Sequence, residues 1–381
     1  MITLASPYDC CGCEACVQAC PRQCIRFSEN AEGFCYPIVD TEACIACSLC
    51  EKVCPMRRPA EAAAPLQVFA ARNRDAAAVS HSSSGGLFTA LAQKVLREGG
   101  VVFGAAFSPG WREVRHIPVE DEAALPALQG SKYLQSRIGN SFAEARAFLE
   151  AGRTVLFCGT GCQILALRRF LSRDYAKLLA VEIVCHGVPS PKVWRKWLDE
   201  TTPAGDTPAG VSFRDKKSGW EDYSVTISFA AHPPRSRPYT KDGYMWLFLH
   251  DCSLRPSCFR CPAKAGRSSS DLTLGDYWGI DTAHPDFYDK NGVSLLLANS
   301  EKGRAFLDGL DVALLPSTLA LAVRENPCFH TPKSEPAERA VFFRKFGRGT
   351  VSVHRLAATF RHQAALAGLL ARLTKKMLRK R

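Results

Sequence analysis

Long hydrophobic runs are absent from this sequence. No stretch approaches the roughly 20 consecutive apolar residues that a helix needs to cross a bilayer. The first ten residues, MITLASPYDC, also lack the charged region and apolar segment of a secretory signal. We therefore expect a soluble, globular, cytoplasmic protein, and its 381 residues, of which 46% are hydrophobic, are enough for two or three domains.

Disulfides are not expected either, although the chain contains 18 cysteines. Cytosolic thiols are kept reduced, so cysteines in a large chain of this kind more often ligate metals or take part in catalysis. Their spacing distinguishes between these roles.

Eight cysteines form two runs with the same spacing, C-x2-C-x2-C-x3-C-P. The first run is Cys10, Cys13, Cys16 and Cys20, and the second is Cys44, Cys47, Cys50 and Cys54. This spacing is typical of bacterial ferredoxins with two [4Fe-4S] clusters, in which the fourth cysteine of each run binds the other cluster. We therefore expect cluster I at Cys10, Cys13, Cys16 and Cys54, and cluster II at Cys44, Cys47, Cys50 and Cys20. The alternative, a pair of zinc knuckles, usually has two separated C-x2-C pairs.

Three cysteines near these runs, Cys11, Cys24 and Cys35, are outside the spacing, and we interpret them as small buried hydrophobic residues. Residues 57–66 are rich in proline and alanine without periodicity, which indicates a linker to a second domain.

The second domain starts with serines and glycines before a predicted helix. Apolar residues from Leu87 to Leu96 have helical spacing, and SSSGG at 82–86 precedes them. Backbone amides at a helix N-terminus attract anions, so this segment could bind a phosphate. The alternative is an ordinary serine N-cap with flexible glycines.

Strands and helices then alternate along the chain. Predicted strands at 101–107, 153–158 and 179–185 are separated by helices, one of which starts near Pro191. This order predicts an α/β fold, in which ligands bind beyond the carboxyl ends of the strands. Residues 158–163 and 185–187 should lie at that edge.

Four further cysteines suggest another metal site. Cys162 and Cys185 follow predicted strands at one edge, and Cys258 with Cys261 forms a C-x2-C pair. We expect a third [4Fe-4S] cluster there, with a zinc site or buried structural thiols as the alternatives. His186 could donate a proton to a reduced substrate, or it could simply pack in a turn.

Several motifs occur in the order seen in a known family. They are SSSGG, GSKYLQS at 130–136, GTGCQ at 159–163, CHGVPSP at 185–191, RPSCFRC at 255–261 and SDLTLGDYWGI at 270–280. From Cys10 to about Asn299, the chain resembles the beta subunit family of coenzyme F420 hydrogenases and dehydrogenases. One departure is Gly161, where the family often has proline, so we expect a looser turn before Cys162.

The resemblance implies a flavoprotein with FAD bound to the α/β domain. The residues that would contact the flavin are Ser82, Ser83, Ser84, Gly85, Gly86, Ser131, Lys132, Tyr133, Gln135, Ser136, Gly159, Thr160, Gln163, Asp271 and Asp276. Lys132 could hold a flavin phosphate or ring oxygen and act in catalysis, or it could be a solvated loop lysine. We expect a ferredoxin domain at 1–58, the N- and C-terminal regions of the family at 66–150 and 151–345, and a tail at 346–381.

The implied function is a flavin-dependent oxidoreductase. It would move electrons between clusters and an organic substrate or a hydride carrier such as coenzyme F420. The expected partner is a ferredoxin or a hydrogenase or dehydrogenase subunit. The alternative is a non-catalytic subunit that relays electrons to another protein.

Positive charge is concentrated near the C-terminus. Residues 321–381 contain fourteen Lys and Arg but three Asp and Glu. Leu369, Leu370, Leu373, Met377 and Leu378 have helical spacing, so the tail could contact a partner or an anionic membrane, or it could be a solvated helix. Nucleic-acid binding is not expected, because the basic residues have no interleaved aromatics.

Overall fold

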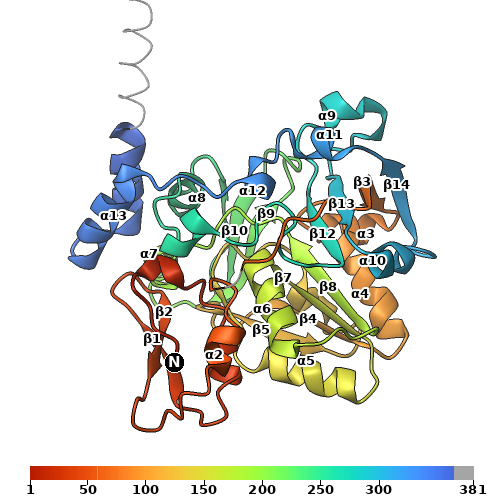
Figure 1. Cartoon of the computed structure of the whole chain (residues 1–381). Coiled ribbons are helices and arrows are strands. Elements are labelled where there is room, and N and C mark those ends of the chain that lie inside the picture. Colours follow the sequence, from red (N-terminus) through yellow and green to blue (C-terminus); the bar gives the residue numbers. More distant parts are fainter. Residues whose placement is uncertain (58, 364–381) are drawn as a thin grey trace, which may run out of the picture.

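The computed structural model describes residues 1–57 and 59–363, and it contains a small N-terminal unit and a large α/β body (Figure 1). Three sheets are present in these ranges, with two, three and nine strands. The predicted α/β class is confirmed.

The N-terminal unit is built around the two cysteine runs. A two-stranded antiparallel sheet, β1 (Ile25–Glu29) and β2 (Cys35–Val39), separates two short helices, α1 (Ala15–Gln18) and α2 (Leu49–Lys52). The residues before these helices, Glu14 and Ser48, have nearly equal left-handed φ angles of 58° and 60°. The two runs therefore follow the same local path.

The large sheet has the strand order β14-β3-β13-β12-β8-β7-β4-β5-β6. In chain order its strands are β3 (Gln67–Asn73), β4 (Val101–Phe107), β5 (Val114–Val119), β6 (Ser136–Arg137), β7 (Val155–Thr160), β8 (Leu178–Ile183), β12 (Leu272–Asp276), β13 (Ser294–Ala298) and β14 (Val312–Pro316). The central strands β12, β8, β7 and β4 are parallel, and the flanking pairs β12–β13 and β4–β5 are antiparallel.

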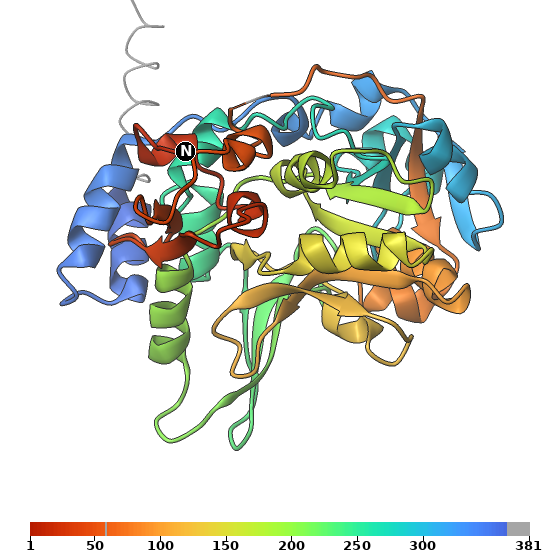
Figure 2. The same cartoon turned by 60° about the horizontal axis from the view of Figure 1, so that its bottom comes forward.

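Helices cover both faces of this sheet. Side chains alternate across each strand, so Val102 and Leu156 pack with α4 (Leu87–Arg97), while Val101 and Val155 pack on the other face. That second face is covered by α5 (Ser141–Glu150) and α6 (Gly161–Leu171). The result is a three-layer α/β/α arrangement, which Figure 2 shows from another side.

A small sheet and three helices connect the large sheet to the N-terminal unit. The small sheet consists of β9 (Pro208–Asp215), β10 (Ser224–Phe229) and β11 (Arg235–Pro238), and the helices are α7 (Pro191–Thr201), α8 (Gly243–Leu249) and α13 (Ala337–Gly347). Aromatic side chains of these elements, among them Trp194, Trp197 and Phe342, form one core. Phe34 of the N-terminal unit belongs to the same core. The N-terminal unit is therefore fixed to the body rather than tethered to it.

The remaining elements are short. They are η1 (Pro7–Asp9), α3 (Ala76–Ser80), η2 (Leu125–Leu128), η3 (Pro256–Arg260), α9 (Ile280–Ala283), η4 (Pro285–Phe287), α10 (Glu301–Phe306), α11 (Leu319–Val323) and α12 (Pro327–His330).

Two of the predicted domain boundaries can be compared with the fold. Strands of the 66–150 and 151–345 regions pair with each other, as β4 does with β7, so both regions build one sheet. Residues 353–363 of the predicted tail are helical, and Val353, Leu356 and Phe360 are buried in the aromatic core. The apolar stripe from Leu369 to Leu378 lies outside the described residues. Within 1–57 and 59–363, no helix has the length and apolar character to span a membrane.

Candidate functional site

The first cysteine set gathers the residues predicted for cluster I. Burial raises the pKa of the Cys16 and Cys54 thiols, and the nearby Cys10 thiol raises both further. Cys16 and Cys54 also act electrostatically on Cys13. The fold thus brings Cys54, from the second run, to the three leading cysteines of the first.

The second set lines a pocket in the N-terminal unit. Its walls include all four cysteines predicted for cluster II, which are Cys20, Cys44, Cys47 and Cys50. The Ile2 amide donates a hydrogen bond to Cys50 Sγ at 3.3 Å, as amides commonly do to cluster ligands. Cys24 is buried, as predicted, and it also lines this pocket, 3.3 Å from Cys20 Sγ.

The third set lies beyond the carboxyl ends of β7 and β8. Cys162 lies in the first turn of α6, Cys185 follows β8, and Cys258 with Cys261 comes from η3 and the residue after it. Burial raises the pKa of Cys185, and the other three thiols of the set raise it further. The four predicted ligands are therefore neighbours. The parallel strands β7 and β8 place Cys162 and Cys185 at one edge, and η3 brings Cys258 and Cys261 to them.

The donor chemistry of the three sets fits iron-sulfur clusters. In the described ranges, no group of three or more His, Cys, Asp or Glu side chains is arranged to hold a metal ion. Each set nevertheless supplies four thiols and no other donor, and a cubane of four irons takes one thiolate per iron. Four thiolates also suit a tetrahedral zinc ion, so the donor set alone does not distinguish a cluster from zinc at Cys162, Cys185, Cys258 and Cys261.

The first and third sets meet at Cys11. Its thiol lies beside Cys162 and is the main reason that the pKa of Cys162 is raised well above its usual value. The same junction is held by Glu14, which is 3% exposed and accepts hydrogen bonds from Arg137 and from the Gly139 amide. The cysteine spacing predicts that Cys11 is a small buried hydrophobic residue, and Cys11 is partly buried and packs against the core under α5 and α6.

The turn before Cys162 is tight, in contrast to the expected looser turn at Gly161. Thr160 and Gln163 form a reciprocal cap at the start of α6, in which the Thr160 amide donates to Gln163 Oε1 at 3.0 Å. A Cβ atom on Gly161 would lie 2.5 Å from Glu182 Oε1, so glycine is the residue that fits here. Gln163 also donates to Ser136 Oγ at 2.9 Å and thus connects α6 to the GSKYLQS segment.

Two of the predicted flavin-binding segments are in direct contact. Ser83 Oγ accepts hydrogen bonds from the Ser131 amide at 2.6 Å and from Ser131 Oγ at 2.7 Å. Ser82 and Ser84 donate to the carbonyls of Ala78 and Val293. No serine caps α4, because the N-cap is Gly86, with a φ of 80°. The ordinary serine N-cap is therefore not what this segment forms.

Lys132 and Tyr133 lie next to these serines. Lys132 is partly buried and donates to the Gln129 carbonyl at 2.7 Å, and burial lowers the pKa of its ammonium to about 7. It is therefore not a fully solvated loop lysine. Tyr133 accepts from Arg214, which forms a 3.0 Å ion pair with Asp276 at the carboxyl end of β12.

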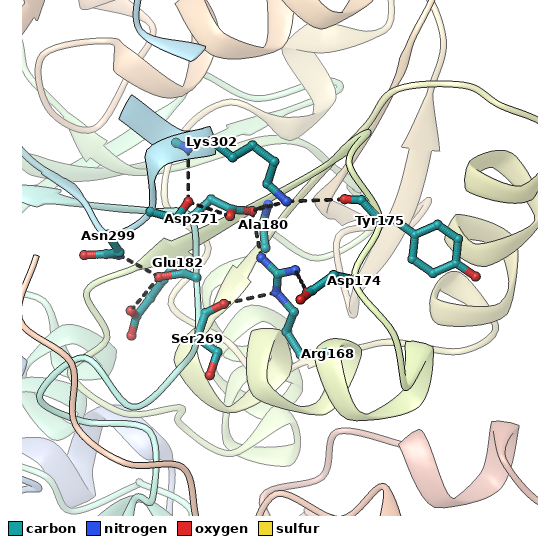
Figure 3. Close-up of polar contacts among 12 residues, drawn as sticks. Arg168, Asp174, Tyr175, Ala180, Glu182, Ser269, Asp271, Asn299 and Lys302 are labelled. Carbon is teal, nitrogen blue, oxygen red and sulfur yellow. Dashed lines mark hydrogen bonds and ion pairs between the residues drawn. The ribbon is translucent and has the colours of Figure 1, made fainter. Parts of the chain in front are cut away.

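Asp271 lies elsewhere. It precedes β12, so it is at the opposite edge of the sheet from Asp276, and Figure 3 shows its contacts. Its carboxylate accepts from the Ala180 amide and from Arg168 of α6, both at 2.8 Å, and pairs with Lys302 of α10 at 3.3 Å. This position indicates that Asp271 holds two helices to the sheet, and it gives no support to a flavin contact.

His186 is part of a polar chain. Its Nε2 lies 2.6 Å from Asp251 Oδ1, and its Nδ1 lies 3.7 Å from Cys328 Sγ. Burial alone would lower the pKa of His186, but hydrogen bonds with Asp251 and Cys328 raise it. Cys328 lines a pocket of about 250 Å³ together with Cys185 and Cys261. Sequence spacing gave no signal for Asp251 or Cys328, because both contacts depend on the fold.

The fold and these thiol sets define an iron-sulfur protein with an α/β body. Residues 152–314 match the C-terminal model of the coenzyme F420 hydrogenase/dehydrogenase beta subunit, and residues 68–141 match its N-terminal model. Residues 37–57 match a 4Fe-4S binding domain. The chain belongs to the coenzyme F420 hydrogenase/dehydrogenase beta subunit family, whose members are subunits of oxidoreductases.

One similar solved structure is a xenon derivative of the F420-reducing [NiFe] hydrogenase complex from Methanosarcina barkeri. The identity is 15%, the TM-score is 0.48, and the match covers 79% of this chain and 93% of that chain. No match was found among curated proteins.

Proposed function

We propose that this protein is a flavin-dependent iron-sulfur oxidoreductase that moves electrons between a redox partner and a small organic substrate or hydride carrier, such as coenzyme F420. The observation that carries the proposal is the position of the third thiol set. Cys162 of this set lies beside Cys11 of the N-terminal unit. The next residue, Gln163, donates a hydrogen bond to Ser136 of the predicted flavin segments.

Bound [4Fe-4S] clusters would transfer single electrons, and a bound flavin would exchange one or two, which is the usual solution where an organic substrate needs two. The thiol sets differ in exposure. Cys47 of the second set is exposed, the four cysteines of the first set are buried, and those of the third set are partly buried. The exposure of Cys47 supports entry or exit of electrons there.

The flavin would rest on the segments that Ser83 and Ser131 connect. Gly85 packs closely against the sheet, because a Cβ atom there would lie 2.6 Å from the Ala71 carbonyl oxygen, and Lys132 would supply an ammonium for a phosphate or a ring oxygen. Gly159 lies near the carboxyl end of β7, and Gln135 donates to the Cys11 carbonyl and accepts from Arg255, whereas the position of Asp271 removes it from this set. His186, held by Asp251, is the proposed proton donor to the substrate.

A relay subunit without a substrate of its own is the second candidate. Four exposed apolar side chains lie in the N-terminal unit: Met1, Ile38, Ile45 and Leu49. Ile45 is 59% exposed and lines the pocket of the second set together with Cys47. The four side chains suit a partner protein, such as a ferredoxin or a hydrogenase or dehydrogenase subunit, and both candidates use one. A cytoplasmic location remains a prediction.

Anaerobic purification followed by identification of the bound flavin tests the proposal. We expect about one FAD per chain, and its reduction and reoxidation by a substrate without a second protein. A protein that holds its iron, binds no flavin and reduces only another protein would be the relay subunit.

A further inference from the structure

Arg255 is a fully buried cation at the junction of the N-terminal unit and the body. Its side chain is 1% exposed, and it makes three hydrogen bonds. Nε donates to the Cys10 carbonyl at 2.7 Å, Nη1 donates to Gln135 Oε1 at 3.0 Å, and Nη2 donates to the Cys35 carbonyl at 2.9 Å. All three acceptors are neutral.

The other buried arginines have carboxylate partners. Arg214 pairs with Asp276 at 3.0 Å, and Arg339 pairs with Glu32 at 2.5 Å. Within 1–57 and 59–363, Arg255 forms no salt bridge. A buried charge without a partner is strongly disfavoured, so a fixed guanidinium here calls for a negative group that the amino acids alone do not supply.

Acidic groups around Arg255 include three thiols. The groups that act electrostatically on the guanidinium are the thiols of Cys10, Cys11 and Cys258 and the phenol of Tyr36. Cys10 belongs to the first set and Cys258 to the third, and the Cys258 amide donates to the Arg255 carbonyl at 3.0 Å. The charge is thus held between two proposed cluster sites.

Aromatic rings and the first cysteine loop surround the guanidinium and exclude solvent from it. The guanidinium lies 4.3 Å from the centre of the Tyr36 ring and 5.4 Å from that of Phe34. Gly12 adopts a left-handed φ of 72°, and a Cβ atom there would lie 2.9 Å from Arg255 Nη1. The cysteine loop is therefore shaped to receive the arginine closely.

We propose that Arg255 is a positioning residue that raises the reduction potentials of the iron-sulfur sites at the first and third cysteine sets. A reduced cluster carries one more negative charge than an oxidised one, so a fixed cation beside its ligands favours the reduced state. The proposal rests on the cluster sites of the proposed function and not on the flavin.

Redox titration of the anaerobic protein, followed by EPR of the reduced clusters, tests this assignment. In Arg255→Met we expect the potentials assigned to these two sites to shift to more negative values, at unchanged iron content. Arg255→Lys, which keeps the charge, should recover most of the shift. The matched control is Arg339→Met, which removes a buried arginine of the same junction whose charge already has a carboxylate; it should leave the potentials as in the wild type.

Iron content is measured first, so that absence of the clusters themselves is distinguished from an error about Arg255. If Arg255→Met does not hold its iron, Gln135→Glu decides, because it keeps an acceptor on Nη1 and adds the missing negative charge; it also removes the donor to the Cys11 carbonyl, so its iron content is measured as well. Its potentials should also shift to more negative values. Wild-type potentials in an iron-replete Arg255→Met or Gln135→Glu protein would overturn the proposal.

Discussion

The Cys11 thiol of the N-terminal unit lies beside the Cys162 thiol at the start of α6, and this contact is the main cause of the raised pKa of Cys162. The two residues are 151 positions apart in the sequence, yet they bring the first and third cysteine sets together. Electron transfer between sites depends on such proximity, so the junction gives the proposed route its central step.

Iron content should follow the three thiol sets. We expect about twelve irons per chain after anaerobic reconstitution, because each cubane contributes four. The double variant Cys258→Ser with Cys261→Ser should lose about four irons and retain the N-terminal eight. Cys252→Ser is the control, since Cys252 is buried and donates to the His250 carbonyl. An iron count in the double variant equal to that of the control would remove the third cluster.

Gly12 should be intolerant of any side chain. Its φ of 72° is unfavourable for other residues, and a Cβ atom would lie 2.4 Å from Gln135 Nε2. Gly205 has a similar φ of 78° but open space around it. Gly205→Ala should therefore cost only about 1–2 kcal/mol of stability for the backbone strain. Gly12→Ala should lower the stability by more than this and should also lower the iron content. Thermal unfolding and iron analysis measure the two effects. Equal losses in Gly12→Ala and Gly205→Ala would show that the contact between the cysteine loop and Gln135 is unimportant.

The bond between Ser83 and Ser131 should support flavin binding. Ser83→Ala removes the acceptor for both the Ser131 amide and its hydroxyl, and a lost hydrogen bond of this kind costs about 1 kcal/mol, or roughly fivefold in affinity. Ser80→Ala is the control, because Ser80 is exposed and bonds within its own helix to the Ala77 carbonyl. Flavin affinity measured by fluorescence should fall only in Ser83→Ala.

Flavin affinity should depend on pH through Lys132. Its pKa of about 7 means that the ammonium is charged below pH 7 and loses its proton above it. An anionic flavin group binds the charged form, so above pH 7 binding must take up a proton, and affinity should fall by up to about tenfold per pH unit. Lys132→Arg should stay charged and bind without this slope. A wild-type affinity that is constant from pH 6 to 9 would place the flavin phosphate away from Lys132.

Much of the site could be predicted from the sequence where chemistry is local. The spacing of each cysteine run determined the N-terminal sets, and the alternation of strands and helices was enough to bring Cys162 and Cys185 to one edge. For Asp271, the motif alone predicts the wrong surroundings, because its position before β12 decides which residues it contacts. Asp271 belongs to the same segment as Asp276, but the two residues are at opposite ends of β12.

Contacts between distant segments could not be predicted. Asp251 lies just after α8 and Cys328 near the start of α12, and both contact His186 in the turn after β8. No spacing in the sequence encodes these contacts. Arg255 looked like a flank of the C-x2-C pair, and its burial against Cys10 depends on how the N-terminal unit docks. The aromatic core around Phe34 determines that docking, and periodicity within each segment does not reveal it.

The route of the electrons is tested most directly by stopped-flow reduction of the flavin in Cys162→Ser, with reductant supplied through the N-terminal sets. Cys162 is the residue at which the third set meets Cys11, and the predicted flavin segments are untouched by this change. We predict that the variant retains its flavin, loses reduction through the N-terminal sets and still accepts hydride from a chemical donor. Flavin reduction through the N-terminal sets at the wild-type rate would contradict the route and return Cys162 to a structural role.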